Sequence, residues 1–481
     1  MQKKFITNLA FLLFLNLLIK PFWILGIDRA VQNTVGAESY GLYSALFNLS
    51  FLFNIILDVG ITNYNNRNIA MHNHLLEKHL SGIIMLRLVL AFAYTIISLS
   101  VAWLLGYKGM QLWMLLVMLI NQALISFILY LRSNIAGLQL FRIDSMISVL
   151  DRAIMIIICS LLIWGHVAGD QFRIEWFVWA QTLAYVITAT ITFIIVAKKA
   201  KLRKLQWNPT FFYIVLKHSY PFAILILLMT FYNRIDSVMI ERLLPNGAEQ
   251  AGIYAQSYRL LDASNMIAYL FSGLLLPMFS HMIKKNQPLQ ELAELSFSFI
   301  AIPAIAMIGF CFFFSHDIMS LLYHAHVDAS ASVFRIVMCC FLAISSVYIF
   351  GTMLTANGNL KYLNIIALSG MVVNIVLNFI LIPKFQSLGA AYASMITQFT
   401  SAGLQILLAH KVFKFKFQSL LAFKYVIHIS LTFYLFYYLS HFDSNWFLKG
   451  MIGCCISVSI ALVLKLIRPF ELVRLLKSEQ S

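Results

Sequence analysis

Charged side chains lie inside or at the ends of long apolar segments of this chain, where they could bind an ionic ligand. The cations set most deeply, or beside a repeated motif, are Lys20, Arg29, Arg234 and Arg259. Arginine donates paired hydrogen bonds to phosphate oxygens, and lysine offers a point charge. Asp262 follows Arg259 by three residues, so the two share one face of a helix. These residues predict an anion-binding cleft, and internal salt bridges with acidic neighbours are the alternative.

A second group of residues offers oxygen ligands rather than positive charge. Asn374 and Asn378 are four residues apart on one expected helix, Thr397 lies on the next, and Asp236 lies two residues after Arg234. Carboxylate, amide and hydroxyl oxygens are hard ligands that can hold a sodium ion. Small polar residues are also common hydrogen-bonding groups between membrane helices. A sodium site and an interhelical network therefore both remain open.

None of the arrangements that bond-breaking chemistry requires is visible in the sequence. No glycine-rich loop precedes a Lys-Ser or Lys-Thr pair, and no paired loop carboxylates stand beside a histidine. The six cysteines sit inside apolar runs without CxxC spacing, which argues against a disulfide framework or a zinc site. We therefore expect no enzymatic activity and no cofactor. Energy would come from a Na⁺ or H⁺ gradient, the membrane potential or consumption of the product.

The composition identifies the kind of element that must position these residues. Hydrophobic residues make up 61% of the 481 residues and charged residues only 11%, and the mean hydropathy is +0.83. A soluble domain has about 25% charged residues, so a soluble enzyme is excluded. The apolar segments lack the alternation of a transmembrane barrel. The predicted fold class is therefore an all-α polytopic membrane protein.

Apolar runs of about 20 residues, separated by polar breaks, predict about fourteen transmembrane helices. Their expected ranges are 5–28, 40–62, 81–106, 110–132, 145–167, 174–197, 214–240, 252–280, 293–315, 331–354, 361–383, 388–410, 420–441 and 446–467. The connections between them are too short for a separate catalytic domain on either side of the membrane.

The distribution of Lys and Arg predicts the orientation of these helices. With the N-terminus placed in the cytoplasm, twenty-one cations fall in inside segments and six in outside segments. Cytoplasmic loops collect Lys and Arg, so both termini are expected inside. This bias also accounts for most of the net charge of +16, which removes the argument for a nucleic-acid partner. The basic run within 198–213 is expected to contact anionic membrane lipid.

A short motif occurs twice in the chain. The sequence GAESYGLYS at 36–44 is matched by GAEQAGIYA at 247–255, so that Gly, Ala, Glu, Gly and Tyr recur at an offset of 211 residues. Each copy opens a predicted span. An offset of six spans gives two halves of the same orientation, an arrangement found in transporters, with a cavity expected between the halves.

The repeat divides the chain into predicted domains. They are an N-lobe at 1–197, a cytoplasmic basic linker at 198–213, a C-lobe at 214–411, and two accessory spans with a cytoplasmic tail at 412–481. Each lobe would contain six helices.

Several stretches resemble the polysaccharide flippases of the multidrug/oligosaccharidyl-lipid/polysaccharide exporter superfamily. They are 26–29, 36–43, 58–61 and 66–70, then 234–240 with 251–254, and finally 374–383 with 388–394. The resemblance implies two lobes around a cleft lined by spans 1, 2, 7 and 8. Arg259 with Asp262 looks like a charged pair of the related lipid II flippases. Their sodium site is similar to Asp236, Asn374, Asn378 and Thr397, although Asn378 stands where the family has an acid.

The resemblance implies that the chain moves an undecaprenyl-diphosphate-linked oligosaccharide from the inner to the outer leaflet of a bacterial cytoplasmic membrane, by alternating access. The product would enter surface polysaccharide synthesis (O-antigen, capsule or exopolysaccharide), with polymerase machinery as a partner. The first alternative is a drug or cation antiporter of the same superfamily, which should favour acidic cleft residues. The alternative from another class is a membrane-embedded oligosaccharide polymerase or ligase, which should carry a larger outer loop.

Overall fold

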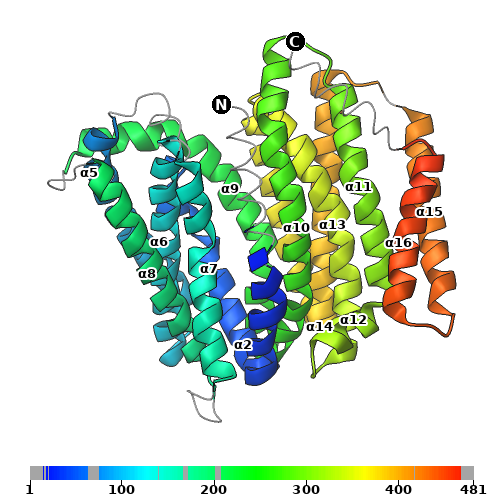
Figure 1. The fold of residues 1–481 in the computed structure, drawn as a ribbon, viewed down its shortest axis with the longest axis horizontal. Coiled ribbons are helices and arrows are strands. Elements are labelled where there is room, and N and C mark those ends of the chain that lie inside the picture. Colours follow the sequence, from blue (N-terminus) through cyan, green and yellow to red (C-terminus); the bar gives the residue numbers. More distant parts are fainter. Residues whose placement is uncertain are drawn as a thin grey trace. The chain divides into compact units, whose positions relative to one another are not determined.

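The computed structural model describes residues 21–62, 75–138, 140–165, 172–200, 207–416 and 418–466, together with residues 15, 18 and 19. Every regular element among these residues is a helix, as Figure 1 shows. Long apolar stretches leave no other way to satisfy the backbone hydrogen bonds inside a bilayer, short of a closed barrel. The predicted all-α membrane class is therefore confirmed. Lys20 is a predicted site residue that lies outside the described residues.

The chain divides into two compact units, Met1–Gly252 and Ile253–Ser481. The first unit contains a π-helix and seven α-helices before α10 begins. They are η1 (Trp23–Asp28), α2 (Arg29–Leu52), α3 (Ile55–Asp58), α5 (Leu75–Leu104), α6 (Met110–Gly137), α7 (Phe141–Ile163), α8 (Ile174–Ala200) and α9 (Pro209–Leu243). Helix α10 (Gly247–Lys284) begins in this unit and continues into the second.

The second unit contains most of α10 and the remaining helices. They are α11 (Gln290–Phe313), α12 (Ser315–Leu322), α13 (Val327–Ala356), α14 (Leu360–Phe413), α15 (Ser419–Ser440) and α16 (Trp446–Val463). The contacts thus group α9 with the N-terminal helices, whereas the predicted lobes assigned 214–240 to the second half. The predicted domain boundaries stay predictions.

Eleven helices of the described part are long and apolar enough to cross a membrane. Two of them are each interrupted by one residue of positive φ, Gly36 at +80° and Gln386 at +54°. These breaks fall between pairs of predicted spans, and glycine adopts such a backbone without the steric penalty of a Cβ atom. The chain is therefore a multi-pass membrane protein, while the number of fourteen spans and their orientation stay predictions.

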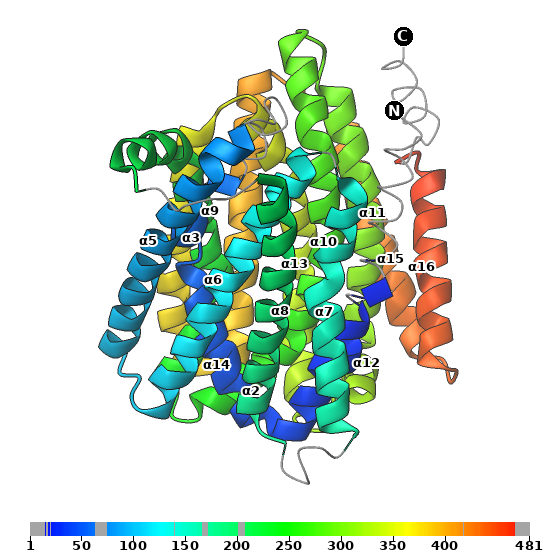
Figure 2. The same cartoon turned by 60° about the vertical axis from the view of Figure 1, so that its left-hand side comes forward.

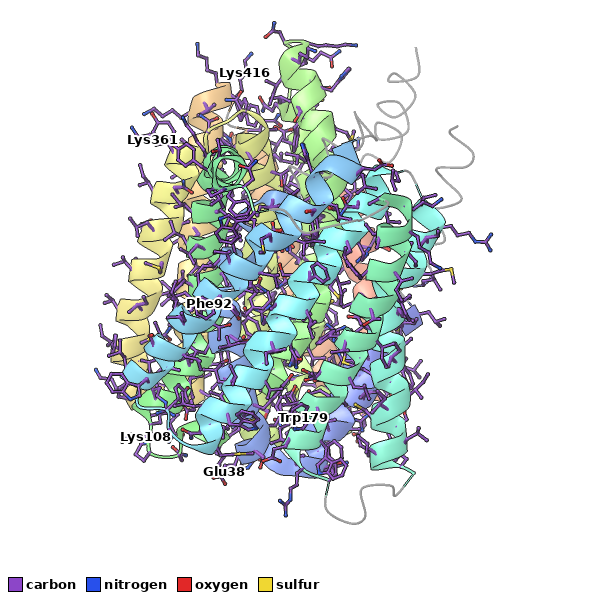
Figure 3. The ribbon with its side chains drawn as sticks, turned by 90° about the vertical axis from the view of Figure 1, so that its left-hand side faces the viewer. Glu38, Phe92, Lys108, Trp179, Lys361 and Lys416 are labelled. Carbon is purple, nitrogen blue, oxygen red and sulfur yellow. The ribbon has the colours of Figure 1, made fainter. Side chains whose placement is uncertain are left out.

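Labelled side chains show which segments share an end of a unit. In Figure 3, Glu38 and Lys108 lie at the same end of the first unit, and Phe92 lies between the ends. Lys361 and Lys416 lie together at one end of the second unit. Glu38 and Lys108 belong to segments predicted outside, and Lys361 and Lys416 to segments predicted inside. In each unit, two residues predicted on the same side of the membrane therefore lie at the same end.

Two groups of neighbouring helices build the first unit. Helix α8 packs against α6 and α7, and α9 packs along α2. Figure 2 shows α6, α7 and α8 side by side. Large apolar side chains cover the outer surface of this unit, and the Phe92 side chain is 70% exposed. Such exposure is expected where helices face lipid rather than water.

The accessory helices α15 and α16 form a pair that packs on α11. The Phe436 ring is fully buried and occupies space left by Gly309 on α11 and Gly453 on α16. Nearby, the His428 Nε2 atom lies 3.1 Å from the Ser457 carbonyl oxygen. Glycines allow a large ring to enter a helix interface in a membrane. The accessory pair is therefore fixed to the second unit by interlocking side chains.

Candidate functional site

The structure places the predicted anion-binding residues in both units. Arg29 and Arg234 lie in the first unit, on α2 and α9, and Arg259 and Asp262 lie on α10 in the second unit. All four side chains are half-buried. A charge at membrane depth is costly unless it meets a partner or a wet cavity. Each of these charges therefore requires a partner or water in its own surroundings.

The helix departs from α-helical geometry immediately before Arg29. The π-helix Trp23–Asp28 begins two residues after Pro21, a residue expected to disturb the helix. Short π-helical segments often occur at functional sites. The buried Asp28 carboxylate accepts hydrogen bonds from the Tyr40 hydroxyl, at 2.9 Å to Oδ1 and 2.8 Å to Oδ2. Tyr40 therefore contributes to holding a buried negative charge beside Arg29.

Arg234 on α9 faces Phe51 on α2, in the region where these two helices pack together. The Arg234 guanidinium carbon lies 5.4 Å from the centroid of the Phe51 ring. A cation over an aromatic face gains about 0.5–2 kcal/mol, depending on its hydration. Asp236 is almost completely buried, with 1% of its surface exposed. A carboxylate so deep in the protein requires hydrogen bonds or a cation to remain charged.

The two copies of the repeated motif meet each other in the first unit. A methyl group on Gly41 would overlap the carbonyl oxygen of Ala248, and a methyl group on Gly252 would overlap the carbonyl oxygen of Ala37. Gly41 is equivalent to Gly252 in the repeat, and Ala37 is equivalent to Ala248. The contact is therefore reciprocal, as at a two-fold axis. The Gln32 amide also donates to the Gly252 carbonyl oxygen at 3.1 Å.

The repeat extends to the hydrogen bonds of its tyrosines. In the first unit, the Gln181 amide on α8 donates to the Tyr43 hydroxyl at 2.8 Å. In the second unit, the equivalent Tyr254 hydroxyl lies 3.4 Å from the Ser394 hydroxyl on α14. Gln181 lies in the predicted span 174–197, the sixth of the first half, and Ser394 lies in 388–410, the sixth of the second half. Each tyrosine therefore contacts the equivalent helix of its own half. These paired contacts support a structural repeat beyond the sequence match.

The aromatic rings next to these hydroxyls repeat as well. Tyr43 stacks with Phe47 at a centroid distance of 6.0 Å, and Tyr254 stacks with Tyr258 at 5.5 Å. One residue after the second ring, however, the halves differ. Asn48 occupies the position equivalent to Arg259. The charge of Arg259 is therefore a departure from the repeat.

Three of the four predicted sodium residues lie in the second unit, on α14. Asn374, Asn378 and Thr397 are each fully buried. The Asn378 amide donates to the Asn374 Oδ1 atom at 3.1 Å, so the structure brings these two together. Asp236, the fourth residue, lies on α9 in the first unit. The oxygen-rich surroundings of the two asparagines suit either a small cation or an interhelical network.

Arg87 on α5 and Asp58 at the end of α3 form an ion pair. The Arg87 Nη2 atom contacts the Asp58 carboxylate, and its Nη1 atom donates to Ser126 at 2.9 Å. The Asp58 carboxylate also accepts from the Gly60 and Thr62 backbone amides, each at 3.1 Å. Because both charges are met by several hydrogen bonds, this cluster ties α3, α5 and α6 together rather than offering a ligand site.

A second cluster was not predicted from the sequence. The Tyr107 hydroxyl donates to Glu241 Oε2 at 2.7 Å, and Arg242 donates to Glu241 Oε1 at 2.6 Å. The Arg242 guanidinium also lies 3.6 Å from the centroid of the Tyr107 ring. Burial, together with the neighbouring Glu241 carboxylate, raises the pKa of Tyr107. The cluster fastens the end of α9 to the connection between α5 and α6.

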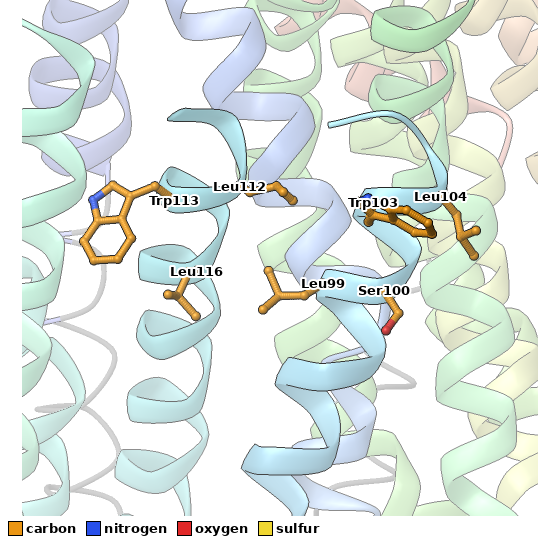
Figure 4. Close-up of a pocket in the computed structure, with 7 residues that line it drawn as sticks. All are labelled: Leu99, Ser100, Trp103, Leu104, Leu112, Trp113 and Leu116. Atoms are coloured by element: carbon orange, nitrogen blue, oxygen red, sulfur yellow. The ribbon is translucent and has the colours of Figure 1, made fainter. Parts of the chain in front are cut away.

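Two cavities among the described residues of the first unit are not suited to an anion. One of about 580 Å³ lies between the ends of α5 and α6 and is lined by apolar side chains and Ser100, as Figure 4 shows. Trp103 and Trp113 are exposed at its rim. Tryptophans commonly sit at the membrane interface. A second cavity of about 440 Å³ includes Arg87, whose charge is already paired with Asp58.

Comparison with solved structures identifies related folds. The lipid II flippase MurJ, in an inward closed conformation, superimposes with a TM-score of 0.68 at 16% identity, covering 94% of this chain and 98% of that chain. An inward-facing multidrug resistance transporter of the MATE family gives 0.64 at 14% identity, covering 83% and 98%. At such low identity these similarities show a shared fold. No curated protein matches the sequence.

A third structure is a MOP superfamily transporter from Pyrococcus furiosus described by a binding pocket of reverse polarity. It gives a TM-score of 0.57 at 14% identity, covering 85% of this chain and 95% of that chain. Independently of these structures, the family model for polysaccharide biosynthesis proteins matches residues 8–283. The match covers more than half of the chain, including both copies of the repeated motif. The chain therefore belongs to the polysaccharide biosynthesis protein family.

Proposed function

We propose that the protein moves an undecaprenyl-diphosphate-linked oligosaccharide from the inner to the outer leaflet of the bacterial cytoplasmic membrane, for surface polysaccharide synthesis. The observation that carries this proposal is the match to the polysaccharide biosynthesis family over residues 8–283. The similarity of the fold to a lipid II flippase supports it, because that protein's substrate is also a lipid. Movement would occur by alternating access, without breaking a chemical bond.

The diphosphate is the part of such a substrate that is most costly to carry through hydrocarbon. Its charges must be stripped of water, and cations in a wet cavity can offset this cost. The residues proposed to meet the diphosphate are Lys20, Arg29, Arg234 and Arg259, with Asp262 orienting Arg259. Arg29, Arg234 and Arg259 lie in the part of the chain that the structure describes, and their side chains are half-buried. The polyprenyl tail can remain in lipid while the oligosaccharide occupies water.

The similarity to multidrug transporters supports a second candidate function, export of organic cations. A site for organic cations should present carboxylates to its ligand. The residues proposed for the cleft include four cations, Lys20, Arg29, Arg234 and Arg259, and one carboxylate, Asp262. The balance of charge therefore favours an anionic substrate. An oligosaccharide polymerase or ligase is the remaining alternative, and no feature of the described residues favours it.

The function is tested by removing the gene from its host. We expect the deletion strain to accumulate undecaprenyl-diphosphate-linked oligosaccharide on the inner leaflet and to lose the surface polysaccharide. Lipid extracts resolved by mass spectrometry measure the first, and staining of surface glycan measures the second. Normal glycan with increased sensitivity to cationic dyes would instead identify the drug transporter.

Sodium coupling is proposed for Asp236, Asn374, Asn378 and Thr397. If these residues hold the ion, Asp236→Asn should remove the sodium-dependent part of thermal stability or transport, because it removes the single formal charge of the set. Melting temperature in NaCl against choline chloride measures this effect. Asp443→Asn is the matched control, since it removes an equal charge from an exposed position. Equal sodium responses in the wild type and Asp236→Asn would leave the four residues as a hydrogen-bonding network.

A further inference from the structure

The cavity of about 580 Å³ between α5 and α6 is a groove on the lipid-facing surface of the first unit. Leu99 and Leu112 are half-buried lining residues, and in Figure 4 they lie between the two helices. Trp103 and Trp113 are exposed on opposite sides of the groove. Both helices are long and apolar enough to cross a membrane, so this surface meets lipid. The apolar walls of the groove therefore suit a hydrocarbon chain.

The two tryptophans place the groove at the membrane interface rather than in the middle of the bilayer. Trp103 lies one residue before the end of α5, and Trp113 lies three residues after the start of α6. An indole ring combines an apolar body with one N–H donor, and such rings gather at the level of the lipid headgroups. A chain in the groove therefore belongs to a molecule whose polar end lies at the height of the α5–α6 connection.

That connection carries a positive charge. Lys108 is exposed, and within the described part of the chain its side chain makes no ion pair or hydrogen bond. Helix α6 begins two residues later, and its N-cap residue Gly109 has no side chain to cap the first backbone amides. Such free amides favour negative charge. The neighbouring Arg242 is already paired with Glu241. The polar end of the ligand is therefore expected to be an anion that meets Lys108.

A second polar group lies inside the groove. Ser100 is an exposed lining residue, and its hydroxyl makes no hydrogen bond with another described group. The exposed Ser459 on α16, by contrast, donates to the carbonyl oxygen of Cys455 in its own helix at 2.9 Å. Ser100 lies four residues before the end of α5, or about 6 Å along the helix. A hydroxyl among apolar groups at this depth requires a hydrogen-bond partner from the ligand.

These features distinguish between the kinds of lipid in a membrane. An anionic glycerophospholipid presents a phosphate to the cation, an ester carbonyl oxygen to the hydroxyl below it, and an acyl chain to the apolar walls. A zwitterionic phospholipid has no net charge to match Lys108. A polyprenyl phosphate has the charge but no ester oxygen for Ser100. The order of cation, hydroxyl and apolar wall along the groove therefore favours the anionic glycerophospholipid.

We propose that the groove binds one anionic glycerophospholipid, such as phosphatidylglycerol. Its headgroup meets Lys108, one ester carbonyl oxygen accepts from Ser100, and the acyl chain lies along Leu99 and Leu112. The bound lipid then joins the ends of α5 and α6 at the surface predicted to lie outside. The described lining residues include none of those proposed to meet the substrate diphosphate. The lipid site is therefore independent of the substrate that the protein transports.

The headgroup contact is tested with Lys108→Gln in the purified full-length protein, by native mass spectrometry of bound lipid. A lysine beside anionic lipid changes affinity by about fivefold, so the variant should bind phosphatidylglycerol about fivefold more weakly and phosphatidylcholine as the wild type does. Lys384→Gln is the matched control, because it removes the same charge from an exposed position that is also predicted outside. Equal affinities of the two variants for phosphatidylglycerol would overturn the headgroup site.

The ester contact is tested with Ser100→Ala. This variant should bind phosphatidylglycerol several-fold more weakly than the wild type. It should bind an ether-linked analogue as the wild type does, because that analogue has no ester carbonyl oxygen to lose. Ser459→Ala is the control, since the Ser459 hydroxyl is already bonded to its own helix. Unchanged affinity of Ser100→Ala for phosphatidylglycerol would overturn the ester contact. Undecaprenyl phosphate that displaces phosphatidylglycerol from the wild type but not from Lys108→Gln would assign the groove to an isoprenoid and overturn the proposal.

Discussion

Replacing Gly41 or Gly252 by alanine is expected to remove most of the folded protein from the membrane. The new methyl group would overlap a backbone carbonyl oxygen, Ala248 for the first variant and Ala37 for the second. Overpacking that side chains can absorb costs about 1–3 kcal/mol, and a helix backbone yields less readily. We therefore expect a loss of at least about 3 kcal/mol for each variant. Because the contact is reciprocal, the two variants should be affected similarly.

Gly403→Ala is the matched control for these substitutions. Gly403 also lies in a helix, but no atom lies within 4 Å of the position where its Cβ would be. Alanine there should leave stability unchanged or raise it by up to about 1 kcal/mol, since glycine is the poorer helix former. Fluorescence-detected size-exclusion chromatography of heated membrane extracts measures all three variants. Equal melting of Gly41→Ala and Gly403→Ala would show that the two copies of the motif are not in contact.

Replacing Arg259 by alanine is expected to abolish export while the protein remains in the membrane. Arginine offers the substrate diphosphate a paired set of hydrogen bonds, whereas lysine retains only the charge. Arg259→Lys should therefore keep part of the export, and Arg259→Ala none. Asp262→Asn should weaken export less, because it removes the charge that orients Arg259 and leaves the arginine itself in place. Flipping of lipid-linked oligosaccharide at matched membrane abundance is the measurement.

The variants must distinguish two roles of Arg259, which are binding of the substrate and formation of a structural charge pair with Asp262. Losing one partner of a buried pair commonly costs about 3–5 kcal/mol of stability, so abundance is measured alongside export. The double variant Arg259→Met with Asp262→Leu removes both charges and keeps the volume. It should restore abundance but not export. Full export by this charge-free protein would refute the anion-binding role of Arg259.

Much of the fold could be predicted because the bilayer limits the choices. A stretch of about 20 apolar residues must be helical to satisfy its backbone, so composition and run length sufficed for the fold class. The residues at which two long helices are interrupted were harder to predict from the sequence. Gly36 opens a repeated motif and could be expected at a turn. Gln386 lies between two predicted spans, but the sequence does not single it out as the residue that adopts positive φ. Local sequence rarely specifies such a conformation for a residue with a side chain.

The candidate site was predictable in its residue types but not in its contacts. Arg87 and Asp58 offset the high cost of isolated charges in a membrane by pairing with each other. The Tyr107–Glu241–Arg242 cluster was missed, since it joins residues more than 130 positions apart. The one signal in the sequence was the adjacent acid and base at the end of a span. Nothing in the sequence assigns Tyr107 to them.

The sequence by itself determined that this protein is a bundle of membrane helices built on a repeated motif. Helical periodicity assigns each polar residue to a face, and the cost of charge in hydrocarbon marks some of them as functional. Only the tertiary structure decided which faces meet. It brought Gly41 against Gly252 in a reciprocal crossing, and it packed the Gln405 amide oxygen on α14 against Gly351 on α13. Contacts between distant helices depend on the packing of whole surfaces, and a one-dimensional pattern does not contain that information.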